Sequence, residues 1–237
     1  MTNELSLLLM ATISIAFIHT LSGPDHYLPF IVIAKVKKWS IAKTAWFTAL
    51  CGLGHVGSSV LLGFIGIALG LAVGKLEFIE GVRGNVISWI FTAFGLIYLV
   101  WGIKQSLRNK PHKHIHVHNT GDMHVHEHTH QKEHLHIHES ADKKNLTPWI
   151  LFTIFVFGPC EPLIPLVMYP AAKHNYHALL LVTVIFSLVT ISTMLSLVLA
   201  ASYGIKFLPM KAMEKYNHAL AGGTIFLCGM GMLFLGL

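Results

Sequence analysis

The sequence predicts an all-α membrane protein of six transmembrane helices, arranged as two inverted repeats of three, with breaks in the first and fourth helices. Composition is the first reason, because 54% of the 237 residues are hydrophobic and only 12% are charged, against about 25% in soluble domains. The second is a series of long apolar stretches. The third is a Gly-Pro motif that occurs twice, as GPDHYLP from Gly23 and as GPCEPLIP from Gly158.

Six apolar stretches reach or approach the ~20 residues that a helix needs to cross a bilayer, and the first two exceed this length. The first has no Lys or Arg in front of it and no small-residue cleavage site after it, so we interpret it as a retained span rather than a signal peptide. The six stretches are Leu5–Ala34, Ile41–Val73, Val86–Ile103, Trp149–Met168, Ala178–Tyr203 and Ala219–Leu237.

The stretches divide into two similar halves. Residues 1–108 form the first three-helix repeat, residues 148–237 form the second, and a His-rich segment, residues 109–147, joins them. Because three spans reverse the direction of the chain, the second repeat would be inverted, as in transporters whose site lies between interrupted helices. The Gly-Pro motif recurs early in each half, and a pair of glycines recurs late, Gly95 and Gly102 in the first and Gly229 and Gly236 in the second.

Basic residues indicate the orientation. They gather in the first, third and fifth connections, around Lys35–Lys43, Lys104–Lys144 and Lys206–Lys215. An excess of Lys and Arg marks the cytoplasmic side of a membrane. We therefore expect a protein of the inner membrane with both termini outside and the His-rich loop in the cytoplasm. The net charge of +6 fits this topology. The chain lacks the basic patch with interleaved aromatic residues that nucleic-acid binding requires, so the lipid bilayer is the expected partner.

Ionisable side chains inside membrane spans are expensive and usually functional. His19, Asp25 and His26 lie in the first span and His55 in the second. His19 and His26 are about two helical turns apart, which places them on one face, and Pro24 breaks the helix between them. Imidazole nitrogens with a carboxylate suit nickel, copper or zinc. The alternative is that His19 is a core histidine bonded to a neighbouring carbonyl and that His55 fills a gap between glycines.

The second Gly-Pro motif carries Cys160 and Glu161. Glu161 would be a metal ligand, a proton carrier or a cap of the broken helix. Cys160 would be a soft metal ligand or a small apolar filler. The remaining cysteines, Cys51 and Cys228, also lie in apolar segments, and three cysteines do not form a disulfide framework.

The central segment alternates histidine with other residues, as in HKHIHVH and HVHEHTH. Such tracts are typical of metal binding, and a segment with few apolar residues should be disordered without metal. A sink, a sensor, a delivery arm and a plain solvated linker would all have this composition. Its histidines are His112, His114, His116, His118, His124, His126, His128, His130, His134, His136 and His138.

These motifs resemble the nickel/cobalt transporter superfamily, in its efflux-type and UreH-like branches. The resemblance is carried by His19, five residues and Asp25-His26, by Leu53-Gly54-His55, and by GPCEPLIPLVMYPAAK in the second half. It implies a transported Ni²⁺ or Co²⁺ ion, with Zn²⁺ or Cu²⁺ as alternatives and no resident cofactor. The implied ligands are His19, Asp25, His26 and His55.

We therefore predict a transporter that exports a divalent metal ion, with protons as the counter-ion. An enzyme is not expected, because the chain has no P-loop and no nucleophile elbow. Three alternatives remain: a UreH-type accessory protein that hands metal to an enzyme, a thiol–disulfide electron carrier, and a sulfite-type anion exporter. The electron carrier is disfavoured because Asp25 stands where a second motif cysteine would be needed. The anion exporter would need Arg, Lys or free helix N-termini in the spans.

Overall fold

The computed structural model describes residues 3–108, 112–117, 123–128, 146–204 and 215–235. Five of its helices are long and apolar enough to cross a membrane, which confirms the prediction of a helical membrane protein with several spans. They are α1 (Asn3–Ser22), α3 (Ile41–Ala68), α4 (Val73–Arg108), α7 (Tyr176–Gly204) and α8 (Asn217–Leu235).

Both Gly-Pro motifs interrupt their helices. After α1 the chain forms a single 3-10 turn, η1 (Pro24–His26), and then α2 (Leu28–Val36). In the second half α5 (Leu146–Phe157) is followed by the non-helical residues 158–162 and by α6 (Leu163–Ala172). Proline lacks the N–H that continues a helix, so each break begins at the Gly-Pro pair.

The predicted count of six transmembrane helices, with the first and fourth broken, is not confirmed in the described residues, where five helices reach the length of a span. The fourth apolar stretch is divided between α5 and α6, which have 12 and 10 residues, and neither reaches the length that a span requires. The boundary between the second and third stretches also differs from the prediction, because α4 begins at Val73 rather than Val86. The added turns carry Glu80 and Arg83, which lie at i, i+3 and pair within the protein, so charges that we assigned to a connection are helical.

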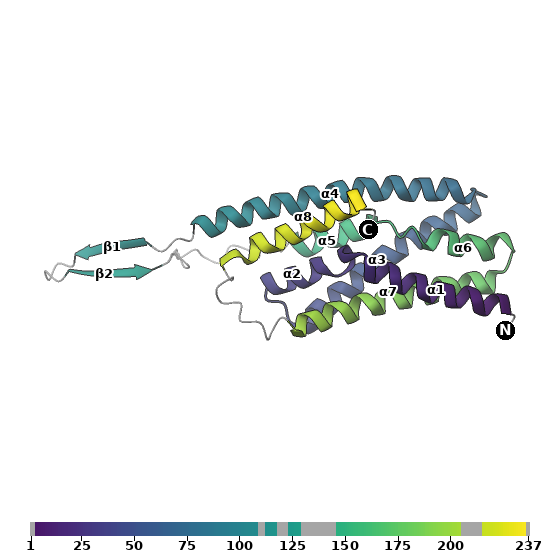
Figure 1. Cartoon of the computed structure of the whole chain (residues 1–237), viewed down its shortest axis with the longest axis horizontal. Helices are drawn as coiled ribbons and strands as arrows, with labels where there is room; N and C mark the ends of the chain where they lie inside the picture. Colours follow the sequence, from purple (N-terminus) through teal and green to yellow (C-terminus); the bar gives the residue numbers. More distant parts are fainter. Residues whose placement is uncertain (1–2, 109–111, 118–122, 129–145, 205–214, 236–237) are drawn as a thin grey trace, which may run out of the picture.

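Helices α4 and α8 run side by side along one edge of the bundle (Figure 1). Their backbones approach so closely that a Cβ atom on any of four glycines would overlap the opposite helix. At Gly222, for example, it would meet the backbone of Leu99. Small residues allow this close approach in membrane helices, and it explains why glycines recur late in each half. The four are Gly95, Gly102, Gly222 and Gly229.

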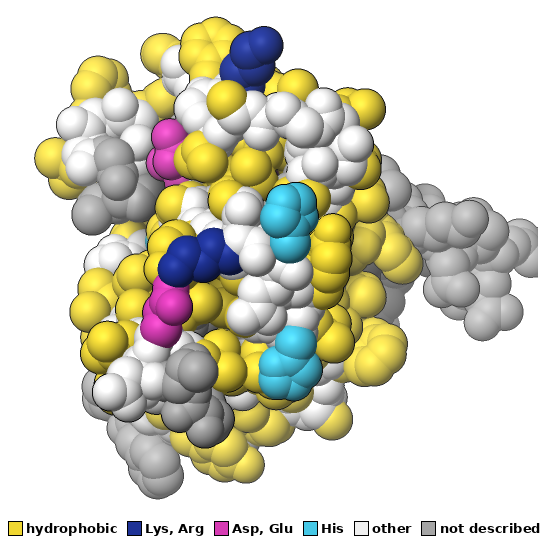
Figure 2. All heavy atoms as spheres, turned by 90° about the vertical axis from the view of Figure 1, so that its right-hand side faces the viewer, with side chains coloured by type: hydrophobic (Ala, Val, Ile, Leu, Met, Phe, Trp, Pro, Cys, Tyr) yellow, Lys and Arg dark blue, Asp and Glu magenta, His cyan; other side chains and the backbone are white. Residues whose placement is uncertain are grey.

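On the other side of the bundle, α7 packs against α1 and α3, and α3 also packs against α5 (Figure 1). The end-on view in Figure 2 shows a surface that is mostly hydrophobic, with single charged side chains scattered over it. Many large apolar residues are exposed, including Trp46, Leu61, Phe78 and Leu227. A surface of this kind fits contact with lipid rather than water, in agreement with the spans.

Two short stretches of the His-rich segment are described. β1 (His112–Val117) and β2 (Met123–His128) form an antiparallel hairpin, drawn beyond the end of the helices in Figure 1. Its register pairs His112 with His128 and His114 with His126. We predicted disorder for the whole segment, and the hairpin differs from that prediction. Residues 109–111, 118–122 and 129–145 lie outside the described residues, and metal binding by the segment stays a prediction.

Candidate functional site

The first break presents two histidines to the interior of the bundle. His19 lies in the last turn of α1 and His26 in η1. Gly23 is required between them, because a Cβ atom there would lie 2.5 Å from His26 Nδ1 and 2.8 Å from Asp25 Oδ1. The tight turn therefore folds the side chains of Asp25 and His26 back over the glycine.

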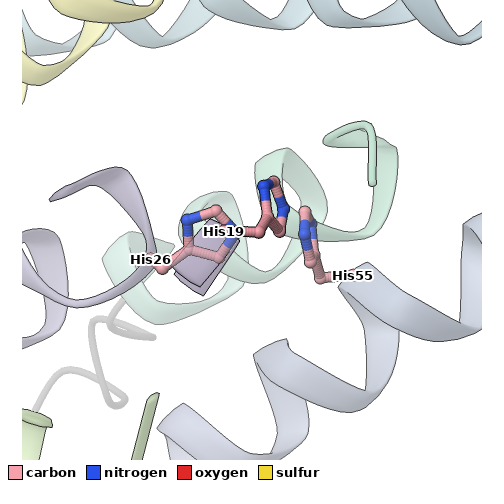
Figure 3. Close-up of side chains that lie close together, drawn as sticks. All are labelled: His19, His26 and His55. Carbon is pink, nitrogen blue, oxygen red and sulfur yellow. The ribbon is translucent and has the colours of Figure 1, made fainter. Parts of the chain in front are cut away.

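His55 of α3 completes a cluster with these two histidines. The ring centroids of His19 and His26 are 4.8 Å apart, those of His26 and His55 are 5.0 Å apart, and both pairs meet edge to face. Figure 3 shows the three rings side by side. One nitrogen from each ring lies within 4.8 Å of the others, so the structure brings together three of the predicted ligands from three separate elements.

Several nitrogens in this cluster are buried and have no hydrogen-bond partner among the described residues. His26 Nδ1 lies 3.1 Å from both Asp25 Oδ1 and Gly23 O, whereas His26 Nε2 has no partner. Both ring nitrogens of His55 are also buried without a partner. A buried polar atom left unpaired costs about 1–3 kcal/mol, so the cluster is arranged as if to receive a ligand.

Asp25 is placed as the partner of His26 rather than as a member of the three-nitrogen cluster. Its carboxylate accepts a hydrogen bond from Nδ1–H of His26, which fixes the tautomer in which Nε2 carries a lone pair. The group of donor atoms within 4.8 Å of one another contains only the three histidines among the described residues.

The second break lies against the same cluster. The Sγ atom of Cys160 is 3.8 Å from Nε2 of His19, and the cysteine is fully buried. A cluster of apolar side chains surrounds it, including Ala16, Val56 and Leu163. Cys160 thus joins the two broken segments, one from each half of the chain.

A buried ionic network holds the second break in place. Arg83 lies with its Nη2 atom 2.8 Å from Oε2 of Glu80, and it donates hydrogen bonds to Ser59 Oγ at 2.6 Å and to Gly158 O at 3.1 Å. The backbone N–H of Cys160 also donates to Ser59 Oγ, at 3.1 Å. We did not predict Glu80, Arg83 and Ser59 as site residues from the sequence. Their i, i+3 spacing on an extended helix would have signalled the first two.

A cavity of about 470 Å³ opens beside the histidines. Glu161 lines it, so that this predicted residue faces the same space without joining the histidine cluster. Gly158 and Pro159 line it as well, on the other side of Cys160 in the sequence. The rest of the lining comes from α1, η1, α3, α4, α5 and α8. The site can therefore offer imidazoles and a carboxylate to something that enters from the cavity, and the buried Cys160 thiol lies behind His19.

The three cysteines do not form a pair. Cys51, Cys160 and Cys228 are all free and buried, and each belongs to a different apolar cluster. No disulfide joins any two of them. Any exchange of thiols at this site would therefore need a second thiol from another molecule.

Residues 28–231 match the family model described as "Cytochrome C biogenesis protein transmembrane region". No match was found among the curated proteins or among the solved structures. The matched residues include α2, the second break and all the helices between and after them, through most of α8.

Proposed function

The chain belongs to the family of cytochrome c biogenesis transmembrane regions, and from this membership we propose that it transfers electrons by thiol–disulfide exchange, with Cys160 as its exchanging thiol. Haem of the c type is attached to the two thiols of a Cys-x-x-Cys-His motif, and those thiols must be reduced to react. A membrane protein that supplies reducing equivalents would meet this need.

Family membership overturns two predictions. The resemblance to nickel/cobalt transporters is wrong, because the matched family is a different one. The prediction of divalent-metal export is wrong for the same reason, and the thiol–disulfide alternative fits the family better. Histidines and carboxylates inside spans indicate a buried polar centre, but these residue types do not distinguish transport from redox chemistry.

The observation that carries the proposal is the position of Cys160. It lies in the non-helical segment 158–162, between two residues that line the cavity, and its Sγ atom faces an imidazole at 3.8 Å. The thiolate is the reactive form of cysteine, and an adjacent imidazole can accept the thiol proton. Cys51 and Cys228 lie within regular helices, and neither has a hydrogen bond to a basic side chain in the described residues.

A single thiol can serve a complete two-electron exchange when its partner is a dithiol. The Cys160 thiolate attacks a substrate disulfide, which forms a mixed disulfide and releases one substrate thiolate. One thiolate of a partner dithiol attacks the Cys160 sulfur next and releases the second substrate thiolate. The partner's second thiolate then frees Cys160 and closes the partner's own disulfide. The net result is one disulfide reduced, one dithiol oxidised and Cys160 returned unchanged.

The finer architecture forms part of this proposal. The two breaks, each followed by a short helix, support an arrangement of two inverted repeats around the site. The distribution of lysines supports external termini and a cytoplasmic His-rich segment. A site between the two halves also suits a redox role, because movement of one half against the other would open the site to each side of the membrane in turn.

The test of the proposal is the formation of a mixed disulfide. Full-length protein in detergent is treated with an excess of 4,4′-dithiodipyridine, a small apolar disulfide that releases one coloured thione for each thiol that reacts. We expect one rapid equivalent from the wild type, its loss in Cys160→Ser, and its retention in the matched controls Cys51→Ser and Cys228→Ser. Loss of the rapid equivalent in a control instead of in Cys160→Ser would contradict the proposal.

A further inference from the structure

The histidine cluster has features that thiol exchange alone does not use. Thiol exchange uses one imidazole, that of His19, whose Nε2 atom lies 3.8 Å from Cys160 Sγ; with an ion on the other ring nitrogen, this nitrogen would carry the proton and stabilise the Cys160 thiolate. His26 and His55 bring three more buried nitrogens with no partner among the described residues. Hydrogen bonding in the protein does not account for these atoms.

We propose that His19, His26 and His55 bind a resident ion of zinc or copper, which stays bound and is not transported. Zinc and copper accept imidazole nitrogen as a preferred ligand. Three protein nitrogens with an open fourth position are also a common arrangement for zinc that takes part in chemistry. The fourth position would face the cavity, which all three histidines line.

Asp25 supports this assignment independently. In protein metal sites the ligating histidine usually donates its other ring N–H to a carboxylate or a backbone carbonyl. His26 has both acceptors, because Nδ1 lies 3.1 Å from Asp25 Oδ1 and 3.1 Å from Gly23 O. This arrangement leaves Nε2 unprotonated and directs it to the cluster. Asp25 is therefore a positioning residue that orients a ligand, and not a ligand itself.

The distances agree with a site that closes around its ion. Two nitrogens bound to one tetrahedral ion at about 2.0–2.1 Å are separated by roughly 3.3 Å. The three donor nitrogens lie within 4.8 Å of one another without an ion. Movement of the donor nitrogens toward one another by about 1.5 Å would bring the most distant pair to this separation.

The site is tested by metal binding to the full-length protein, in a background where the eleven histidines of the segment 109–147 are replaced by asparagine. These replacements remove competing sites without shortening the chain. Zn²⁺ and Cu²⁺ are each titrated in the presence of a competing chelator, and bound metal is measured by mass spectrometry after gel filtration. We expect one ion per chain, and Mg²⁺ should not compete.

Four variants separate the site from general damage. His26→Ala and His55→Ala should each abolish the stoichiometric ion, while His177→Ala, an exposed histidine, should retain it. Asp25→Asn should keep the stoichiometry and weaken the affinity by about 10–100-fold, as expected for loss of an outer partner. A purely structural role of Asp25 would leave the affinity of the folded protein unchanged.

The result also distinguishes this inference from the proposed function. Cys160→Ser should retain the ion, because the three histidines suffice, although it should lose thiol exchange. Absence of a bound ion in the background protein, or equal binding by His26→Ala and His177→Ala, would overturn the metal site. Those outcomes would not bear on the role proposed for Cys160, which the mixed-disulfide experiment tests separately.

Discussion

Replacement of Arg83 by methionine should be among the most destabilising single changes in this protein. Glu80 is fully buried, and its carboxylate has the Arg83 guanidinium 2.8 Å away. Removal of one partner of a buried ion pair costs about 3–5 kcal/mol, because the other charge remains without compensation. For a chain of this size about 2–4 °C of Tm is lost per kcal/mol. We therefore expect Arg83→Met to lower the Tm by about 6–20 °C.

The assay is thermal unfolding in detergent, followed by intrinsic fluorescence, and it includes a double-mutant cycle. Neutralising both partners in Arg83→Met/Glu80→Gln should recover much of the loss, because no isolated charge is then buried. The matched control is Lys75→Met, an exposed cation on the same helix, which should change the Tm little. A Tm of Arg83→Met equal to that of Lys75→Met, or simple addition of the effects of the two single changes, would refute the buried pair.

Three further substitutions test contacts of the site and of the bundle. Gly23→Ala should displace His26, since the new methyl group would lie 2.5 Å from Nδ1, and metal affinity should fall at least tenfold by chelator competition. Gly74→Ala, where nothing lies within 4 Å, is its control and should bind as the wild type does. Gly222→Val should separate α4 from α8 and destabilise the protein by about 1–3 kcal/mol. The control Gly223→Ala should be tolerated, because its Cβ atom would meet only Leu99 Cδ1, at 3.8 Å. Equal Tm values for the two variants would contradict the close packing. Ser59→Ala removes the acceptor shared by Arg83 and the Cys160 N–H and should lower the free energy of unfolding by about 1–3 kcal/mol. Its control is Ser58→Ala, because the Ser58 hydroxyl bonds only within its own helix. This variant should be near neutral in the same unfolding assay.

The sequence was sufficient to predict the membrane class and both helix breaks. Several apolar stretches that reach or approach ~20 residues in one chain are typical of membrane spans, and a Gly-Pro pair interrupts a helix because proline lacks the backbone N–H. The spacing of His19 and His26 predicted only a shared helix face; the two rings meet because α1 ends at Ser22 and His26 lies in the turn η1. Their meeting with His55 was only a conjecture from sequence, because it depends on how α3 packs against the first break.

Other features depend on tertiary contacts that no local pattern contains. Glu80 and Arg83 resemble residues of a polar connection, and only their burial against Ser59 and Gly158 identifies them as part of the site. The break in the fourth stretch was predicted, but not that both of its pieces would be shorter than a span, at 12 and 10 residues. The function was misjudged because one buried set of His, Asp, Glu and Cys is compatible with several chemistries, and the family match contradicts metal transport.

Electron transfer across a membrane is the most direct measurement of the central claim. The full-length protein would be reconstituted into vesicles that enclose a disulfide-bonded peptide with the sequence Cys-x-x-Cys-His, and a membrane-impermeant dithiol would be added outside. We predict that the enclosed peptide becomes reduced with the wild type, Cys51→Ser and Cys228→Ser, and stays oxidised with Cys160→Ser. Reduction at the wild-type rate by Cys160→Ser would contradict a thiol–disulfide role for this cysteine.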